Sequence, residues 1–351
     1  MLVVVPCAGR SSRYPNLPPK WSLPDQRGRP MLMSALDGLD LADHRIAVTI
    51  LREHEESLGA TAGIRSALGD AVEVVILDEP TSSQSETVSL TLDRVGWTGA
   101  FLVKDSDNYF EIGNLEQQYN YVCVDSLNNH DQINPRNKSY VQVDHVDRIQ
   151  GIREKHVVSD LFSVGGYAFC DATQFQDHYR LLIAHADDTH PEIYLSDVIA
   201  HMILDDLPFK ARKVAAYRDW GTVKEWRTEL ERTQTFVVAL DGVLFEMGSL
   251  YFRPLFDDVA PRWNSIEAVS ELLRLGHQVV VLTVRPAELS ELTEHQLAGI
   301  GLAGLPIKYG INSSTWSLVT QRLEATPLLA GRHVNLTSEP AASVEEWLAE
   351  Q

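Results

Sequence analysis

Small polar residues and two cations follow an apolar run at the N-terminus. Residues 2–5 are mostly β-branched, and Cys7-Ala8-Gly9-Arg10-Ser11-Ser12-Arg13 comes soon after them. This pattern predicts a buried strand that enters a tight loop and then a helix N-terminus, where several backbone N–H groups point at one anion. Arg13 contributes a forked cation and Lys20 a compact one. Gly9 alone predicts no more than a turn, but together these residues suit the binding of a polyphosphate.

Two carboxylates two positions apart follow a second apolar run. Asp105 and Asp107 come directly after residues 101–104, at the predicted carboxyl end of a strand. Ligands bind at that edge in open α/β sheets. Paired carboxylates there suit a hard cation such as Mg²⁺, held between protein and phosphates. A polar turn or a helix cap explains a lone Asp-x-Asp equally well.

The N-terminal loop, Pro19-Lys20 and Gly28-Arg29-Pro30-Met31 together resemble the signature of the sugar-phosphate nucleotidylyltransferase family. That signature is Ala-Ala-Gly-x-Gly-Ser/Thr-Arg, then Pro-Lys, then Gly-Lys-Pro-Met. Ser11 stands where the family has its second glycine, the residue that allows the closest backbone approach. The resemblance implies that Arg13 and Lys20 are catalytic. It assigns four loop residues to the nucleotide: Ala8, Gly9, Ser11 and Ser12.

The same resemblance assigns two metal ligands. The segment around Asp107 is similar to the family motif Gly-Asp-Asn-x-Phe, with Asp107 at the ligand position. Tyr217-Arg-Asp219-Trp-Gly221-Thr222 is similar to Asp-x-Gly-Thr, in which Asp219 supplies the second carboxylate. Asp105 is a further candidate ligand, and the implied cofactor is Mg²⁺.

Weaker matches for the base and the acceptor fall between these motifs. Residues 81–87 resemble the base-reading loop, although a helix cap made by Ser83 and Glu86 fits them as well. The base-contacting candidates are Gln84, Ser85, Glu86 and Thr87. The acceptor candidates are Lys155 in a Glu-Lys element, Gly166 in a Gly-x-Tyr-x-Phe-like strand and Glu192 in a Glu-x-Tyr-x-Thr-Asp-like segment. Taken alone, a lysine such as Lys155 is usually just solvated.

Strands and helices must alternate to position these residues. Short apolar runs predict strands at 46–51, 72–77, 100–103 and 119–124, and a helical pattern covers 85–95. The predicted fold class is α/β, with a mostly parallel Rossmann-like sheet. The resemblance implies that this sheet is of the GT-A nucleotidyltransferase type. A second α/β pattern follows, with strands at 235–240 and 278–283 and helices at 266–275 and 288–299. We therefore expect a nucleotidyltransferase domain at 1–233 and a smaller Rossmann-like domain at 234–351.

The second domain resembles the haloacid dehalogenase-like hydrolases without their nucleophile. The first motif of that family aligns with residues 235–244, and its nucleophilic aspartate falls on Ala239, which cannot attack phosphorus. The remaining candidates of this degenerate site are Asp241, Thr283, Arg285 and Lys308, and the fourth motif would lie near 334–339. A structural, dimerising or regulatory module is the expectation. Such fusions resemble proteins of capsule and surface-polysaccharide synthesis.

Composition limits the partners. The chain has 351 residues, a formal net charge of −19 and 44% hydrophobic residues. So negative a chain repels nucleic-acid phosphates rather than neutralising them, which argues against a nucleic-acid partner. The three cysteines lie far apart, as expected for thiols of a reducing compartment. No apolar run reaches membrane length, so we expect a cytoplasmic protein; homo-oligomerisation is left open.

These features together predict an enzyme that transfers a nucleoside monophosphate from an NTP and releases pyrophosphate. The acceptor would be a phosphorylated small molecule, either a sugar 1-phosphate or a smaller phosphate or phosphonate. A metal-dependent GT-A glycosyltransferase is one alternative, because Asp105-Ser-Asp107 also suits its metal site. It does not need the triphosphate-gripping loop. A non-catalytic nucleotide sensor is the other alternative, and the retained Lys20, Asp107 and Asp219 argue against it.

Overall fold

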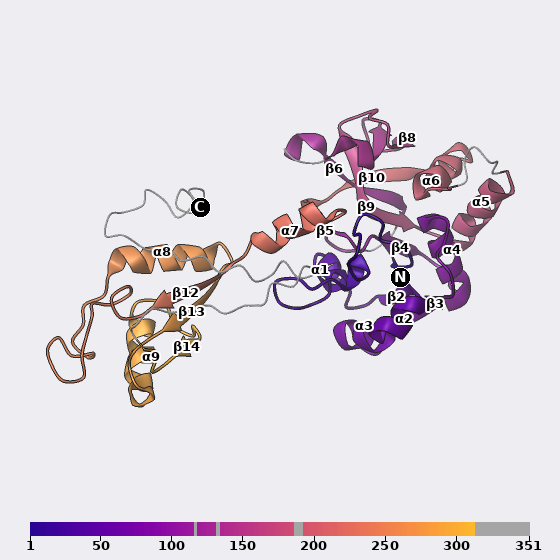
Figure 1. Cartoon of the computed structure of the whole chain (residues 1–351). Helices are drawn as coiled ribbons and strands as arrows, with labels where there is room; N and C mark the ends of the chain where they lie inside the picture. The colour runs from indigo at the N-terminus through magenta and orange to yellow at the C-terminus, as the bar shows by residue number, and fades with distance from the viewer. Residues whose placement is uncertain (116–117, 131–133, 186–191, 313–351) are drawn as a thin grey trace. The chain divides into compact units, whose positions relative to one another are not determined.

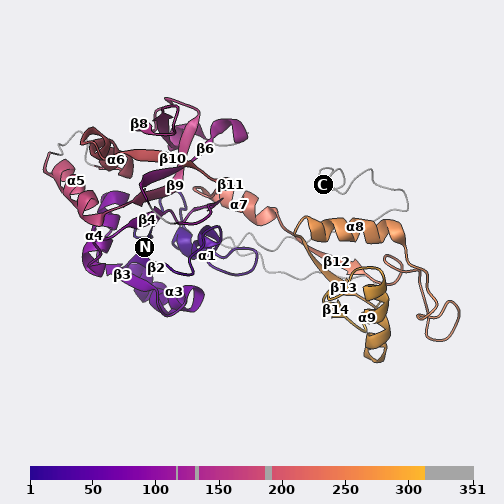
Figure 2. The same cartoon turned by 180° about the vertical axis from the view of Figure 1, so that it is seen from behind.

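The computed structural model describes residues 1–115, 118–130, 134–185 and 192–312 (Figures 1 and 2). The chain divides into two compact units, residues 1–226 and 227–351. The division falls inside helix α7 (Val223–Glu231), close to residue 233, where the sequence analysis places its boundary. Each unit has its own sheet and its own hydrophobic core.

The first unit is built on a nine-stranded sheet with the main order β10-β6-β9-β4-β1-β2-β3, beside which β7 and β8 pair. The pairs β1–β2, β1–β4, β2–β3 and β10–β6 are parallel, whereas β9 runs antiparallel to β4 and β6. The predicted α/β class with a mostly parallel sheet is therefore confirmed. The strands are β1 (Leu2–Pro6), β2 (Arg45–Leu51), β3 (Glu73–Leu77), β4 (Phe101–Lys104), β6 (Asn120–Ser126), β7 (Ser139–Val143), β8 (Ile149–Glu154), β9 (Leu161–Phe169) and β10 (Phe209–Lys213).

Alternation along β1 divides the core of this unit between the two faces of the sheet. Val3 and Val5 join a cluster that α1 and α3 cover, whereas Leu2 and Val4 join a second cluster under α4, α5 and α6. Successive side chains of a strand point to opposite faces, so a run of β-branched residues fits a strand that is buried on both sides. The helices are α1 (Met31–Leu36), α2 (Arg52–Leu58), α3 (Ala60–Leu68), α4 (Gln84–Val95), α5 (Ala172–Ala184) and α6 (Leu195–Leu204).

The helix expected directly after the first loop is absent from the described structure. Turns occupy the segment after Ser11, a single 3₁₀ turn spans Lys20–Ser22, and the first α-helix begins at Met31. Pro15, Pro18 and Pro19 lie in this segment, and prolines lack the backbone N–H that a continuing helix needs. The prediction of a helix N-terminus at the anion loop was wrong for this reason.

A two-stranded ribbon joins distant parts of the first unit at the edge where β4 ends. β5 (Asn108–Glu111) pairs antiparallel with β11 (Ala215–Asp219), with Asn108 opposite Asp219. Just beyond the pair, the Trp220 backbone N–H donates to the carbonyl of Asp107 over 2.9 Å. This pairing brings the segments that carry Asp107 and Asp219 together, although they are far apart in sequence.

The second unit has a smaller, three-stranded parallel sheet of order β12-β13-β14. Helix α8 (Trp263–Arg274) connects β12 (Thr235–Ala239) to β13 (Gln278–Leu282), and α9 (Ser290–Gly299) leads to β14 (Ile307–Lys308). Leu240, Ile266 and Val281 belong to its core. The strand–helix–strand–helix order predicted for this part of the chain is therefore present.

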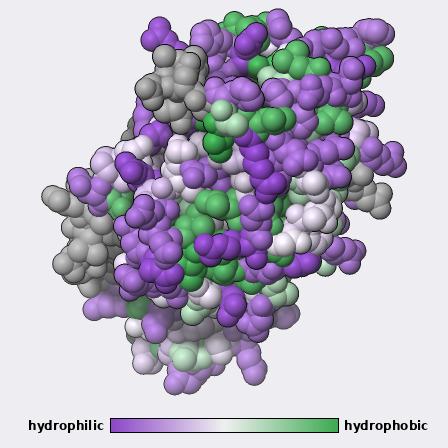
Figure 3. Space-filling view, turned by 90° about the vertical axis from the view of Figure 1, so that its right-hand side faces the viewer, coloured by the Kyte–Doolittle hydropathy of each residue, from purple (hydrophilic) through white to green (hydrophobic). Residues whose placement is uncertain are grey.

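The surface is largely hydrophilic on the face shown in Figure 3, where hydrophobic residues form small groups between charged and polar ones. This agrees with the formal net charge of −19. Among the described residues, no helix is both long and apolar enough to cross a membrane.

Candidate active site

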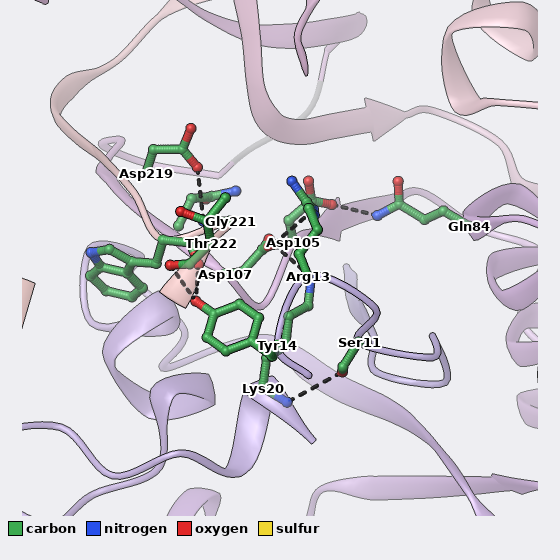
Figure 4. Close-up of polar contacts among 12 residues, drawn as sticks. Ser11, Arg13, Tyr14, Lys20, Gln84, Asp105, Asp107, Asp219, Gly221 and Thr222 are labelled. Carbon is green, nitrogen blue, oxygen red and sulfur yellow. Dashed lines mark hydrogen bonds and ion pairs between the residues drawn. The ribbon is translucent and has the colours of Figure 1, made fainter. Parts of the chain in front are cut away.

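The loop after β1 adopts a backbone conformation that favours glycine at Ser11. Ser11 has φ +47°, in the left-handed region that residues with a Cβ rarely occupy. Its hydroxyl accepts a hydrogen bond from the Lys20 backbone N–H at 3.3 Å (Figure 4). Gly9 is exposed, and a Cβ placed on it would meet nothing within 4 Å. The left-handed conformation that the family's second glycine can adopt is thus present here with serine in its place.

Two cations from this segment meet one carboxylate. Lys20 Nζ lies 2.6 Å from Asp107 Oδ2, and Arg13 Nη2 lies 3.5 Å from the same oxygen. Asp107 is only 8% exposed. Burial alone would raise the pKa of Asp107, but the charges of Lys20 and Arg13 outweigh it and hold the pKa well below its usual range. The carboxylate therefore stays ionised beside its cations at neutral pH.

Asp105, two residues away, lies in a different electrostatic environment. The Gln84 amide donates to its Oδ1 (Figure 4), and no lysine or arginine side chain is found to ion-pair with it among the described residues. Burial and the charge of Asp107 raise the pKa of Asp105 to about 6. The two carboxylates thus have their pKa values pushed in opposite directions.

A fully buried lysine fixes the loop that carries both carboxylates. Lys104 Nζ donates to the backbone carbonyl of Asp105 at 2.7 Å, to the carbonyl of Asn108 at 2.9 Å and to Asn108 Oδ1 at 2.6 Å. Burial lowers the pKa of Lys104 to about 8. Sequence reasoning assigned Lys104 no role; its position at the end of an otherwise apolar strand was the available signal.

Asp219 has a lysine partner that the sequence analysis missed. Lys138 Nζ donates to Asp219 Oδ2 and, at 2.7 Å, to the hydroxyl of Tyr217. The Lys138 side chain is 12% exposed. Residues 134–137, which precede it, are exposed, but Lys138 itself turns inward. Its partner lies 81 positions away, so no local signal identified it.

Tyr14 ties the N-terminal loop to the segment after β11. Its hydroxyl donates to the backbone carbonyls of Trp220 and, at 3.0 Å, of Thr222 (Figure 4). Between these two residues, a Cβ on Gly221 would lie 2.9 Å from Arg13 Nη1. The close approach of the two segments therefore requires a residue without a side chain at Gly221 or a displaced guanidinium.

The acceptor candidates Lys155 and Glu192 are linked through a tyrosine. Lys155 Nζ lies 3.0 Å from the Tyr194 hydroxyl, which in turn donates to Glu192 Oε2 at 2.7 Å. Glu154, next to Lys155, accepts hydrogen bonds from the hydroxyls of Ser139 and Ser196. Lys155 and Glu192 are exposed, while Tyr194 borders the cavity described below.

Two adjacent glycines of β9 face different surroundings. A Cβ on Gly165, which has φ +82°, would lie 2.4 Å from Asp105 Oδ2 and from Asn108 Nδ2. A Cβ on Gly166 would instead meet Phe110 and Cys123 in the core. Of the pair, Gly165 borders the cavity, whereas the sequence analysis names Gly166 as the acceptor contact.

Among the four base-reading candidates, the structure brings Gln84 to the carboxylates and places the others elsewhere. Ser85 and Thr87 are buried, with Ser85 donating to the Ile193 carbonyl and Thr87 paired with Thr81. Ser83 caps α4 by accepting from the Glu86 backbone N–H at 3.2 Å, and Glu86 accepts from the Ser82 N–H. Ser83 therefore caps the helix, and Gln84 is the base-contacting candidate that faces the cavity.

A polar cavity of about 150 Å³ joins these groups. Its lining comes from strands β5, β7, β8, β9 and β11, from the first residues of α4 and α6, and from the loops that follow β1 and β4. The charged residues on it are Arg13, Asp105, Asp107, Lys138, Glu154 and Asp219. Its carboxylate oxygens are the hard donors that Mg²⁺ prefers, and both cations on Asp107 contact the same oxygen, Oδ2. The donor set therefore fits a divalent cation.

The second unit places three of its four candidates in one buried network. The Thr283 hydroxyl donates to Asp241 Oδ2 at 2.5 Å, and Arg285 Nε donates to Asp241 Oδ1 at 2.9 Å. Arg285 is 0% exposed and its Nη1 also donates to Thr293 and Gln296. Lys308 lies on β14 with an exposed side chain, and the expected fourth motif near 334–339 lies outside the described residues. Arginine thus provides the positive charge beside Asp241.

Comparison with solved structures supports the fold of the nucleotidyltransferases. The nucleoside-diphosphate-sugar pyrophosphorylase from Vibrio cholerae RC9 matches 66% of this chain and 100% of its own, with TM-score 0.56 and 20% identity. The inositol-1-phosphate CTP transferase from T. maritima matches 66% and 96%, with TM-score 0.52 and 14% identity. UDP-glucose pyrophosphorylase complexed with UDP-glucose matches 66% and 97%, with TM-score 0.52 and 14% identity.

No family model matches the chain, and neither does any curated protein. The likeness to the solved structures is therefore one of fold, at identities of 14–20%. The matched part is 66% of this chain, which is close to the share of the first unit, residues 1–226. Over about two thirds of its length, this protein has the fold of the nucleotide-sugar pyrophosphorylases.

Proposed function

We propose that the first unit transfers a nucleoside monophosphate from an NTP to a phosphorylated small-molecule acceptor and releases pyrophosphate. One observation carries the proposal: Lys20 and Arg13 converge on Asp107 at the edge of a polar cavity. Lys20 is 24% exposed and Arg13 52%, so both cations can turn from the carboxylate to an incoming phosphate.

The chemistry requires positioning more than proton transfer. A phosphomonoester has a second pKa near 6 and is therefore largely a dianion at pH 7. One of its oxygens attacks the α-phosphorus of the NTP; the new O–P bond forms as the bond from the α-phosphorus to the bridging oxygen breaks, and that oxygen leaves on pyrophosphate. No general base is needed. Lys20 and Arg13 neutralise the charge that gathers on the phosphates during this exchange.

Asp107 and Asp219, with Asp105 beside them, are the residues that would hold Mg²⁺. The ion would supply additional neutralisation of phosphate charge. Lys20 and Lys138 neutralise two of these carboxylates in its absence. With Mg²⁺ bound, the ammonium groups of Lys20 and Lys138 would be available to hold phosphate oxygens. The pairs therefore keep the lysines pointed into the site before substrate arrives.

On the acceptor side, we assign the phosphate to Lys155 and the rest of the acceptor to the groups around Tyr194. The hydrogen-bonded series Lys155–Tyr194–Glu192 offers a cation, a hydroxyl and a carboxylate in sequence. A sugar or polyol with several hydroxyls suits this mixture of donors and acceptors. Gly165 lets the side chains of Asp105 and Asn108 approach β9 more closely than any residue with a Cβ would allow.

Pyrophosphate release tests this function directly. The full chain is incubated with Mg²⁺, each of the four NTPs in turn, and a panel of sugar 1-phosphates and small phosphorylated alcohols or phosphonates. Release that requires both substrates establishes the reaction class and identifies the base and the acceptor. A glycosyltransferase would release a nucleoside diphosphate from a nucleotide sugar and no pyrophosphate. NTP binding without turnover across the panel would favour the sensor.

We further propose that the second unit is a phosphatase-like module without phosphatase activity. Ala239 stands at the position of the nucleophilic aspartate in the haloacid dehalogenase-like hydrolases that this unit resembles. Arg285 forms a buried ion pair with Asp241. The variant Ala239→Asp restores the missing carboxylate. Because Arg285 still neutralises Asp241, we expect no hydrolysis of p-nitrophenyl phosphate by this variant. Metal-dependent hydrolysis by the unchanged chain would overturn the assignment, and hydrolysis by Ala239→Asp alone would show that Arg285 does not block the site.

A further inference from the structure

A second cluster of potential metal ligands lies between α5 and α6, outside the cavity. His178 comes from α5, and His201 and Asp205 come from the last turn of α6 and the residue after it. The two Nδ1 atoms of the histidines are 2.7 Å apart, and Asp205 Oδ2 is 3.8 Å from His178 Nδ1. One potential ligand atom from each residue lies within 4.8 Å of the other two.

The facing Nδ1 atoms are an unusual arrangement for two histidines without an ion. Each Nδ1 carries either a proton or a lone pair, so the pair is satisfied only if the two rings adopt opposite tautomers and share one proton. A cation between the rings satisfies both lone pairs at once.

The spacing on α6 supports the same conclusion independently. His201 and Asp205 are four residues apart, which places them on one side of the helix, facing α5. Two imidazole nitrogens and one carboxylate oxygen form a ligand set that suits Zn²⁺, with a fourth position open to water. At Zn–N distances of about 2.0–2.1 Å, tetrahedral geometry places two nitrogens about 3.3 Å apart. The side chains need to open only slightly from their present separation.

We propose that His178, His201 and Asp205 bind one Zn²⁺ ion that links α5 to α6. The ion would hold the C-terminal end of α6, whose N-terminal end borders the cavity through Tyr194, Leu195 and Ser196. His201 is about 9 Å along the helix from Leu195, at 1.5 Å per residue. The ion would fix the helix that presents the acceptor-side residues, and its binding does not depend on the proposed transferase activity.

Metal binding to the full chain tests the proposal without an activity assay. Chelator-treated protein is titrated with Zn²⁺ in excess Mg²⁺, so that the carboxylates of the cavity do not compete, and Co²⁺ is titrated in parallel for its visible d–d absorption. We expect one equivalent of Zn²⁺ to bind, with a tetrahedral or five-coordinate Co²⁺ spectrum and a rise in Tm.

Matched variants decide whether this cluster is the site. His201→Gln should weaken Zn²⁺ binding at least about 100-fold, beyond the 10–100-fold cost of losing an outer-shell partner. Asp205→Asn, at an exposed carboxylate, should weaken binding without impairing folding, and it guards against a misfolded His201 variant. His145→Gln replaces an exposed histidine in a turn and should bind as the parent does. No stoichiometric Zn²⁺ binding in the parent, or equal affinity in all variants, would overturn the proposal.

Discussion

Each unit of this protein holds a buried aspartate against a cation, but only one of these pairs is open to solvent. In the first unit Asp107 meets Lys20 and Arg13, whose side chains are 24% and 52% exposed. In the second unit Asp241 meets Arg285, and the two side chains are 3% and 0% exposed. An exposed cation can exchange its carboxylate for a phosphate, whereas a buried one cannot do so without opening the core. Solvent access therefore distinguishes the proposed binding site from the buried ion pair.

In the second pair, the residues around Asp241 enclose its carboxylate almost completely. Arg285 donates to Asp241, Thr293 and Gln296, and its guanidinium lies 4.9 Å from the ring centre of Phe256. Its Nη2 has no hydrogen-bond partner among the described residues. A buried pair of this kind contributes little net stability as a whole, but removing one partner leaves an uncompensated charge. This gives the largest effect that we expect.

Arg285→Met should destabilise the second unit by about 3–5 kcal/mol, because Asp241 is then buried without a cation. The measurement is hydrogen exchange of the amides in β12 and β13, which reports on this unit alone. Arg274→Met is the matched control: this arginine pairs with Glu271 on the surface of α8, and its loss should cost no more than about 1 kcal/mol. The double variant Asp241→Leu/Arg285→Met should recover most of the loss. If the Arg285→Met protein were as stable as the parent, the ion pair between Arg285 and Asp241 would not be needed for the stability of the second unit.

In the open pair, the effect should appear in turnover. Lys20→Ala should lower kcat for pyrophosphate release by about 10²–10³-fold, the usual cost of losing one preorganised charge-stabilising group. Its thermal stability should stay close to that of the parent, because Lys20 is partly exposed and Arg13 still faces Asp107. Arg27→Ala removes an exposed cation of the same segment and should leave kcat unchanged. Unchanged kcat in Lys20→Ala would remove Lys20 from the mechanism.

The sequence predicts the open pair better than the contacts that surround it. Lys20 and Asp107 stand in local patterns, and the apolar runs located five strands of the nine-stranded sheet (β1, β2, β3, β4 and β6) within two residues, because β-branched runs specify buried strands. The strands β7, β8 and β10 were not predicted. Tyr14 and Lys138 gave no such signal, since their partners lie 206 and 81 positions away. Arg285 was named for an expected phosphate site, but its complete burial depends on how α9 and the sheet pack. Tertiary contacts of this kind have no signature in a single sequence.

The third prediction concerns the two neighbouring carboxylates of the first unit. Asp107 forms ion pairs with Lys20 and Arg13, whereas Asp105 forms none with a lysine or arginine among the described residues. The raised pKa of Asp105 means that its neutral form is favoured by the fold. Its contribution to stability is therefore greatest below about pH 4, its unfolded pKa, and is lost as pH rises through about 6. Asp107, with its pKa lowered, contributes in the opposite direction: its stabilisation is present at neutral pH and is lost as pH falls below its unfolded pKa near 3.8.

Asp105→Asn should consequently stabilise the first unit by about 1–2 kcal/mol at pH 7 and very little at pH 4. Denaturant unfolding across this pH range measures the difference. Asp107→Asn should behave in the opposite way, destabilising at pH 7. Parallel pH profiles for the two variants would contradict the division of charge within the cluster. If Asp105 also helps to hold Mg²⁺, the more stable Asp105→Asn protein should need more Mg²⁺ for half-maximal turnover.

The smallest expected effect concerns the loop that presents the open pair. Ser11 has φ +47°, a conformation that costs a residue with a Cβ about 1–2 kcal/mol relative to glycine. Its hydroxyl recovers part of this cost by accepting from the Lys20 N–H at 3.3 Å. Ser11→Ala loses the hydrogen bond and keeps the strain, so it should be less stable than the parent. Ser11→Gly loses both and should lie within about 0.5 kcal/mol of the parent, while remaining about 1 kcal/mol more stable than Ser11→Ala. Unfolding of the three proteins under one condition gives both differences. If the alanine and glycine variants are equally stable, the left-handed backbone at Ser11 is not the conformation that the loop adopts in solution. The comparison of the exposed pair at Asp107 with the buried pair at Asp241 would then rest on Lys20 alone.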